Sequence, residues 1–546
     1  MSVEVQTGWV VPPPPIRGLD HLGVQAYCIA LYGQLLPGIT NVTDRARYYS
    51  FYPWLLWSFE RRYSDHSKDE FSRILRRAEC LLALISAYHE TTLDEDERDH
   101  GAATVGRIKL RRRGEAARDG EVTNLEEFAR FEGESCYFKN RLGGLGQYYF
   151  GPLRDLQIVD YVENDRTLPP GYDRVRGAAL AEAFEGAVPS DRFFQVLEDG
   201  TVGQAELADL VAFCPCGLKE SEAERRLLLD LFFARTDTWP DDGGSTRRAS
   251  LALLLDLVQQ SQAPGMQLEE LLRGAAYTGR LADGTAWNVS PNWQRTRDGW
   301  GVYARNEILS IALQGLFWAQ LRGIEDQGGT IRSTEEAAWF LRDTVSESLG
   351  AEYADLTVTS AVERLASSLA NVDDWSGNEH EIRRAWRTAS LAEAGAPPEE
   401  VAKESAILLL SLLVRGLHDD PYQEFDLDPA YFAPAEIHLA SLRQKAPEWQ
   451  DWPLREWASW IGRRWCIERH LHVALRKLRI ENRDTFRIRP LDGLLSLVEA
   501  PPVVFTSPRI AKAEQILRDL DLLRPRDDWY VLTNAAESIL EECRGQ

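Results

Sequence analysis

Apolar residues recur every three or four positions along most of this chain, and this spacing constrains the fold more than any other feature. The segment from residue 73 to residue 89 is typical, because its apolar residues fall on one side of a helix: Leu75, Ala78, Leu81, Leu82 and Ile85. Long runs of alternating apolar and polar residues, the pattern of half-buried strands, are absent. The sequence therefore predicts a mainly α fold, with β structure confined to short hairpins near residues 485–498 and 523–532.

The chain has 546 residues, enough for several domains at roughly 100–200 residues each. Two segments rich in Asp, Pro and Gly, residues 237–245 and 419–434, interrupt the helical pattern. We therefore expect a multi-helical body made of an N-terminal helical domain (1–240) and a middle helical domain (241–430). A C-terminal domain (431–546) would combine a basic helix with a small α+β domain.

Three observations bear on the cellular compartment. The first fifteen residues lack the basic and apolar regions of a signal peptide. The longest apolar stretch, residues 406–414, is too short to cross a bilayer, which takes about twenty residues. Seven cysteines, an odd number spread over a long chain, do not form a disulfide framework. Together with a strong excess of Arg over Lys, these features predict a bacterial cytoplasmic protein that does not bind membranes.

Charge is distributed unevenly along the sequence. The net charge of −23 disfavours general binding to polyanions, because the protein and the phosphates repel each other. Residues 452–546 contain 16 Lys+Arg and 14 Asp+Glu, a net of +2, which leaves −25 for residues 1–451. Within this part, residues 463–489 carry nine cations and three acids. A basic stripe on an acidic protein is the pattern expected of a local nucleic-acid contact.

The most informative segment runs from Ser507 to the end of the chain. Ser507 is suited to cap a helix, and Pro508 fits the first helical position, where no hydrogen-bond donor is needed. This helix would bury residues at spacings of three and four: Ile510, Ala513, Leu517 and Leu520. A charged turn, a β-prone run at 529–532 and a last helix capped by Thr533 or Asn534 follow.

This order of helix, charged turn, strand and helix resembles the end of a bacterial winged helix. The resemblance implies that the first helix is the recognition helix and that the charged turn is the wing. Arg509, Lys512 and Gln515 would then face outward, toward base edges or phosphates. The expected nucleic-acid-binding residues lie on this helix, on the basic helix before it and in the wing: Arg509, Lys512, Gln515, Arg476, Lys477, Arg524 and Arg526.

Two other interpretations of this module stay open. Winged helices also serve as protein-docking or dimerisation modules, and some are plain scaffold. Four carboxylates in the module would repel DNA: Asp519, Asp521, Asp527 and Asp528.

A dense string of aromatic residues follows Thr43, with Arg45 and Arg47 at its start. Arginines beside aromatic rings can stack on bases or bind phosphates. We favour a packed aromatic core in which the arginines are tied to carboxylates, because so many exposed rings would leave a large apolar patch. The string, residues 36–54, resembles the N-terminal signature of uncharacterised bacterial proteins associated with phage-defence gene neighbourhoods. No activity or site comes with that resemblance.

Motifs for catalysis are weak or absent. The sequence contains no phosphate-binding loop, dinucleotide fingerprint, nucleophile elbow or zinc-protease helix. Cys214-Pro-Cys216 has one-residue spacing and no second pair nearby, so a loop at a helix end is favoured over zinc. Arg463 or Arg464 with His470 has the spacing of helical Arg–His ribonucleases, but a basic patch explains it without catalysis. The acidic run at 379–381 is expected to be solvated. We therefore predict no catalytic residue, no metal and no cofactor.

These features favour a non-enzymatic component of a bacterial antiphage defence or DNA-handling complex. Its acidic helical body would bind other proteins of a multi-subunit complex, and the winged helix would contact DNA or a partner. One alternative is a helical ribonuclease or other nuclease of a defence system. The other is a transcriptional regulator, although bacterial regulators are usually much shorter.

Overall fold

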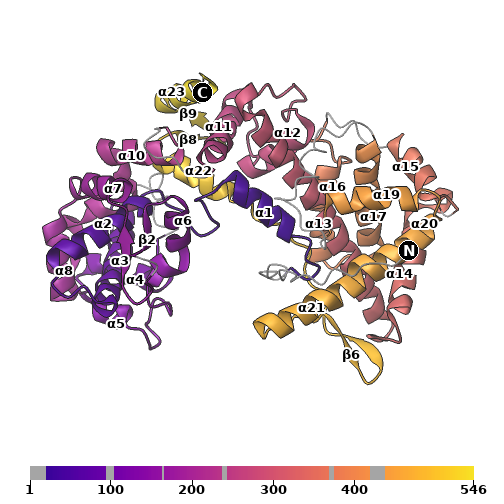
Figure 1. The fold of residues 1–546 in the computed structure, drawn as a ribbon, viewed down its shortest axis with the longest axis horizontal. Helices are drawn as coiled ribbons and strands as arrows, with labels where there is room; N and C mark the ends of the chain where they lie inside the picture. The colour runs from indigo at the N-terminus through magenta and orange to yellow at the C-terminus, as the bar shows by residue number, and fades with distance from the viewer. Residues whose placement is uncertain are drawn as a thin grey trace, which may run out of the picture. The chain divides into compact units, whose positions relative to one another are not determined.

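The structure is a computed structural model that describes residues 20–93, 104–162, 165–235, 243–353, 355–367, 374–417 and 437–545 (Figure 1). Over these residues the chain is mainly α, with small antiparallel sheets, as the apolar periodicity predicts. No helix in the described ranges combines the length and apolar character that a bilayer crossing requires.

The chain divides into two compact units that are discontinuous in sequence. One unit, here called unit 1, comprises the described residues of 1–32, 270–288 and 297–507, and unit 2 those of 33–269, 289–296 and 508–546. This division differs from three consecutive domains, because the last 39 residues return to the unit that contains the N-terminal helices. The expected boundary at 430/431 lies outside the described residues.

Unit 2 is built around two long helices, α2 (Tyr48–Arg62) and α3 (Lys68–Glu90). Helix α3 begins after Ser67, whose side chain accepts a hydrogen bond from the Glu70 amide. Shorter helices pack on this pair: α4 (Arg107–Ala116), α5 (Leu125–Ala129), α7 (Arg176–Glu185), α8 (Ser190–Asp199), α9 (Gln204–Asp209) and α10 (Glu222–Phe232). Helix α6 (Phe150–Asp155) also belongs to this unit, as does α11 (Gly244–Gln260), which packs against α10.

The aromatic string lies on α2 and forms the core of unit 2, which confirms the prediction. The rings are almost completely buried: Tyr48, Tyr49, Phe51, Tyr52 and Trp54. Both arginines at the start of the string are buried in ion pairs. Arg45 bonds Asp519 with both Nε and a terminal nitrogen, each at 2.9 Å. Arg47 contacts Glu224 at 3.1 Å.

The segment at residues 91–123 is a polar insertion that opens with an acidic run, and it is partly a packed helix. Helix α4 lies along α3, with Leu110 fully buried. Gly114 allows the close approach, because a Cβ there would lie 2.8 Å from the Leu84 carbonyl oxygen. Residues 94–103, which include most of the acidic run of this insertion, lie outside the described part.

Unit 1 contains helices that pack in pairs: α14 (Thr334–Leu349), α15 (Val358–Ala366), α16 (Glu381–Glu393), α17 (Pro398–Leu417), α19 (Leu439–Trp449), α20 (Leu454–Ile461) and α21 (Glu468–Glu481). A π-helical turn, Gly462–Ile467, joins α20 to α21 into a nearly continuous helix. Three helices have segments in both units: α1 (Ala26–Leu35), α12 (Leu268–Thr278) and α13 (Gln294–Asp326).

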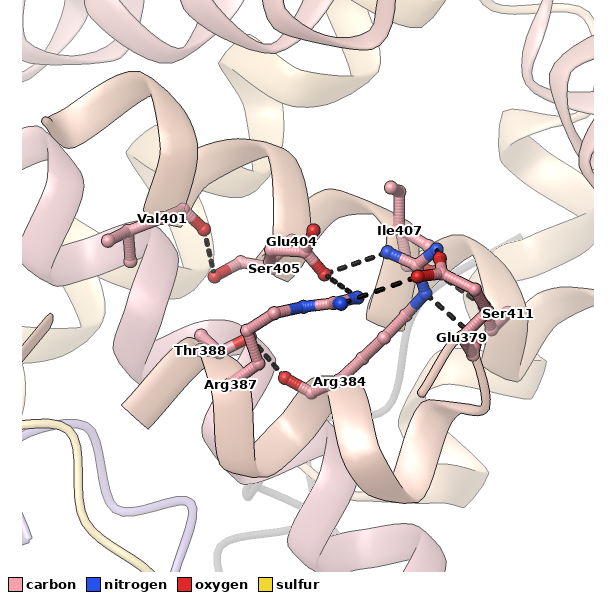
Figure 2. Close-up of polar contacts among 9 residues, drawn as sticks. All are labelled: Glu379, Arg384, Arg387, Thr388, Val401, Glu404, Ser405, Ile407 and Ser411. Carbon is pink, nitrogen blue, oxygen red and sulfur yellow. Dashed lines mark hydrogen bonds and ion pairs between the residues drawn. The ribbon is translucent and has the colours of Figure 1, made fainter. Parts of the chain in front are cut away.

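Helices α16 and α17 are joined by an arginine–glutamate network. Arg384 and Arg387 both bond Glu404, at 2.8 and 3.1 Å, and both also reach Glu379, as Figure 2 shows. Side-chain hydroxyls on the same helices bond carbonyls one turn back, from Thr388 to Arg384, from Ser405 to Val401 and from Ser411 to Ile407 (Figure 2). The hydroxyls are thereby satisfied inside an apolar helix pair.

Both hairpins predicted from the sequence are present. Strand β6 (Ile488–Leu491) pairs with β7 (Leu494–Leu497), and β8 (Leu523–Arg526) pairs with β9 (Trp529–Leu532). The expectation that β structure is confined to them is wrong. Short additional strands occur elsewhere: β5 (Thr330–Ile331) beside β7, β1 (Thr123–Asn124) with β4 (Thr201–Val202), and β2 (Val159–Tyr161) with β3 (Pro170–Tyr172).

Candidate interaction surfaces of the C-terminal segment

The end of the chain folds as the predicted helix, hairpin and helix. Helix α22 (Ile510–Asp519) leads into the β8–β9 hairpin, and α23 (Asn534–Gly545) follows with Thr533 as its cap. The hairpin and α23 lie against α11 in unit 2 (Figure 1). The start of α22 differs from the prediction. Arg509, in the left-handed conformation with φ of 67°, precedes the helix in place of a Ser507 cap.

Arg509 does not face outward. One terminal nitrogen donates to the carbonyl oxygens of Leu36 and Ile39, at 3.1 and 2.6 Å. These carbonyls belong to the loop that follows α1, so they lie outside the hydrogen-bond ladder of that helix. Arg509 therefore anchors this loop to α22, and the predicted orientation is wrong.

The rest of the polar face of α22 is also engaged within unit 2. Lys512 forms an ion pair with Asp44, and Gln515 donates to Asp519 at 2.9 Å. Asp519 is buried, where it accepts from Arg45 and from the Ala46 amide. The segment before α2 covers the face that a recognition helix would present to DNA. The expectation that Lys512 and Gln515 face outward is therefore wrong as well.

The turn between β8 and β9 is exposed, as a wing would be. Arg524 is paired with Asp521 at 3.0 Å, and its side chain is 64% exposed. Arg526 is exposed and forms no ion pair within the described residues. Asp527 and Asp528 complete the turn, so the wing carries two cations beside three carboxylates. Its net charge does not favour phosphate by itself.

The two cations predicted on α21 do not form an exposed pair. Lys477 is 1% exposed, and its ammonium donates to the Asp20 carbonyl oxygen at 2.8 Å. Burial lowers the pKa of Lys477, and the nearby charge of Asp20 opposes that shift. Arg476 is half-buried. Lys477 therefore holds the start of the described chain against α21 and is not available to a ligand.

The C-terminal end of α21 has a composition that we did not predict. Leu475, Leu478 and Ile480 are 49, 39 and 62% exposed, which is unusual for three apolar side chains so close together. Arg479 and Arg483 are exposed beside them and form no side-chain hydrogen bond or ion pair within the described ranges. We call these five residues the α21 surface. The sequence does contain a signal for the α21 surface, namely apolar residues that fall outside the buried stripe of the helix.

The hairpin of β6 and β7 exposes apolar side chains too. Leu491 and Leu494 flank its tip, with 54 and 39% exposure, and Val498 follows at 46%. In Figure 1 both this hairpin and the end of α21 extend from the helices of unit 1. The hairpin is therefore a second element of unit 1, besides α21, with several exposed apolar side chains.

The Arg–His pair of the nuclease hypothesis does not form a site. His470 is fully buried; Nδ1 lies 3.1 Å from the His21 carbonyl oxygen, and Nε2 accepts from the Arg487 amide at 2.8 Å. Arg463 and Arg464 instead bond Glu468, each at 2.7 Å. Neither ring nitrogen of His470 is available to a phosphate.

The acidic run at 379–381 is engaged in ion pairs, which differs from the predicted solvated loop. Glu381 is fully buried and accepts from Arg415 at 2.6 Å and from the Tyr277 hydroxyl at 2.7 Å. Burial alone would raise the pKa of Glu381, but the charges of His380 and Arg415 outweigh it and bring this pKa to about 2. These carboxylates stabilise the fold and are poor candidates for a metal site.

We compared the chain with protein-family models, with curated proteins and with solved structures, and none of them matched.

Proposed function

We propose that this protein is a non-enzymatic component of a bacterial antiphage defence or DNA-handling complex, and that it binds a partner protein through the α21 surface. The single observation that carries the docking role is the exposure of Leu475, Leu478 and Ile480 on one projecting helix end. The assignment to defence rests on the resemblance of residues 36–54 to proteins of such gene neighbourhoods.

The chemistry of the α21 surface specifies the kind of partner. Apolar side chains at positions 475 and 478 are neighbours on the helix, and Arg479 lies one turn after Leu475. An amphipathic helix that carries Leu- or Phe-like side chains and carboxylates would bury the former and pair the latter with Arg479 and Arg483. Such a partner removes the apolar surface from water and neutralises both cations.

A variant that places charges in the apolar patch tests this proposal. We expect Leu475→Glu with Leu478→Glu to lower recovery of a co-purifying partner by more than about 10-fold, because interface anchors are typically worth about 2 kcal/mol or more. Ile108→Glu is the matched control, since Ile108 is 99% exposed on helix α4 of unit 2. Thermal unfolding should be unchanged in both variants, because surface substitutions usually alter stability by no more than about 0.5 kcal/mol. Equal recovery from wild type and both variants would refute the docking role.

A second candidate function is nucleic-acid binding, favoured by the exposure of Arg479, Arg483 and Arg526 without ion pairs in the described part of the chain. The covered face of α22 argues against base readout by that helix. Contacts would therefore be to phosphates and independent of sequence. Gel shifts with duplex DNA, single-stranded DNA and RNA, with and without Mg²⁺, test this function, and cleavage in the same assay would revive the nuclease alternative.

A further inference from the structure

The described residues contain one group of three potential metal ligands from two distant parts of unit 2. His89 lies in the last turn of α3, and Cys214 and Cys216 flank Pro215, 125 residues later. One ligand atom of each residue lies within 4.8 Å of the other two, and Cys216 Sγ is 3.3 Å from His89 Nδ1. The sequence shows only the two cysteines, because the fold supplies the histidine.

These separations suit a tetrahedral metal. Zinc bonds to sulfur at about 2.3 Å and to imidazole nitrogen at about 2.0–2.1 Å, so two ligand atoms on one tetrahedral ion lie roughly 3.6–3.8 Å apart. The distance from Cys216 Sγ to His89 Nδ1, 3.3 Å, is slightly shorter than that range, and the other two separations are at most 4.8 Å, so small side-chain adjustments suffice. Two thiolates and one imidazole are the ligands that zinc prefers among protein side chains.

The cysteine loop is held in place by contacts that do not involve its thiols. Arg47 donates to the carbonyl oxygens of Ala212 and Cys214, at 2.5 and 2.6 Å. Helix α3 also packs against the 3₁₀ turn Val211–Phe213 that precedes the cysteines. Because the backbone on both sides is fixed, the site would lose little conformational entropy when a metal binds.

Metal binding at this group requires the two thiols to lose their protons, because cysteine binds zinc as the thiolate. The short distance between the three ligand atoms lets one ion contact all of them, and its positive charge offsets the repulsion between the two thiolates.

We propose that His89, Cys214 and Cys216 form a binding site for a soft divalent metal, with zinc as the ion that best fits the ligands. Cys214 is fully buried, whereas His89 and Cys216 are half-buried, so the fourth position opens toward solvent and can hold water. The ion would join the end of α3 to the loop before α10. This site is independent of the α21 surface.

Cobalt titration of the reduced full-length protein tests the site. We expect one equivalent of Co²⁺ to produce the tetrahedral visible bands and the thiolate-to-cobalt absorption of a two-cysteine site, and Zn²⁺ to abolish both. Cys216→Ser and His89→Gln should each weaken binding by more than about 100-fold, since even loss of an outer-shell partner costs roughly 10–100-fold. Cys136→Ser is the matched control, because Cys136 is also half-buried but bonds the Phe138 carbonyl.

A second measurement does not depend on the folding of variants. In the wild type, Zn²⁺ should protect two of the thiols from alkylation, with Cys214 and Cys216 identified by peptide mass. Absence of the thiolate-to-cobalt absorption, equal binding by all three variants, or a Cys214–Cys216 disulfide that persists after reduction would overturn the proposal.

Discussion

At the scale of single residues, Glu79 shows how several partners can satisfy a buried carboxylate. Glu79, fully buried on α3, accepts from the hydroxyls of Tyr52 and Tyr137 and from the amides of Gly144 and Leu145, at 2.6 to 3.0 Å. Burial raises its pKa, and these four donors oppose that shift. A buried carboxylate is costly unless its oxygens are satisfied, so Glu79 serves to fix α2 and the 144–145 turn against α3.

Trp54 allows a direct test of the aromatic core. It is fully buried among Phe184, Phe193 and Phe213, and its indole nitrogen donates to Glu185. We expect Trp54→Ala to lower the free energy of unfolding by roughly 3–5 kcal/mol, as for other buried aromatics. Trp57→Ala is the control, because Trp57 is half-buried and stacks on Arg61. Denaturant unfolding measures both, and equal losses would contradict a core role specific to Trp54.

His470 should make stability depend on pH. Burial, followed by the charges of Arg487 and Lys477, lowers its pKa to about 4, from an ordinary value near 6.5. Between pH 4 and pH 6.5, His470 binds a proton in the unfolded chain but not in the folded one. Its contribution to the free energy of unfolding is therefore complete above pH 6.5 and declines as pH falls toward 4. The slope from this one group approaches about 1.4 kcal/mol per pH unit.

The variant His470→Gln isolates this effect, because an amide can still donate and accept but does not titrate in this range. We expect this variant to have a lower free energy of unfolding at pH 7. Between pH 4 and 6.5 its free energy of unfolding should depend less steeply on pH, by up to the slope that corresponds to one bound proton. Burial, followed by the charges of Arg487, His470 and Lys477, lowers the pKa of His21 to about 3, so His21 adds a slope of the same sign in both proteins. Identical slopes for wild type and variant would show that His470 can be protonated in the folded state.

At the scale of elements, helix α22 illustrates what an amphipathic pattern can and cannot specify. The spacing of Ile510, Ala513 and Leu517 correctly predicts its buried face. The polar face could not be predicted, because it is covered by a segment some 470 residues earlier in the chain. The spacing of apolar residues identifies the buried face of a helix, but it does not identify the segment that packs against the polar face.

The same reasoning explains the other differences between expectation and structure. The core arginines Arg45 and Arg47 could be predicted as ion-paired because aromatic neighbours imply burial, although their partners Asp519 and Glu224 could not. The His89–cysteine group was missed because its ligands are far apart in sequence. Local signals thus specified helices and hairpins, whereas sites assembled from distant segments required the fold.

Arg509→Ala tests whether Arg509 anchors the loop after α1 to α22. The substitution removes the guanidinium that donates to the carbonyls of Leu36 and Ile39, and a lost charge-assisted hydrogen bond costs about 1.5–3 kcal/mol. We expect that loss in the free energy of unfolding, measured with denaturant. Arg524→Ala is the control, because its pair with Asp521 is exposed and worth no more than about 1 kcal/mol. Equal stability of Arg509→Ala and wild type would restore Arg509 as a surface residue.

At the scale of the whole molecule, net charge limits what the exposed cations can do. The chain carries −23, and the exposed arginines that form no ion pair in the described ranges are scattered over both units, for example Arg112, Arg332 and Arg455. Duplex DNA is attracted by these side chains and repelled by the rest of the surface. The isolated chain is therefore expected to bind duplex DNA weakly.

The second proposed function therefore makes a quantitative prediction about salt. The isolated chain should retain duplex DNA weakly at physiological ionic strength and more strongly in dilute salt, with a log–log slope of about 0.9 for each phosphate contacted. Arg479→Ala with Arg483→Ala should lower that slope by about two if both side chains contact phosphates. Arg524→Ala is the control, because its guanidinium is already paired with Asp521 and should change the slope less. Tight binding that is insensitive to salt, or an unchanged slope in the double variant, would exclude these arginines as the phosphate contacts and leave the α21 surface to proteins alone.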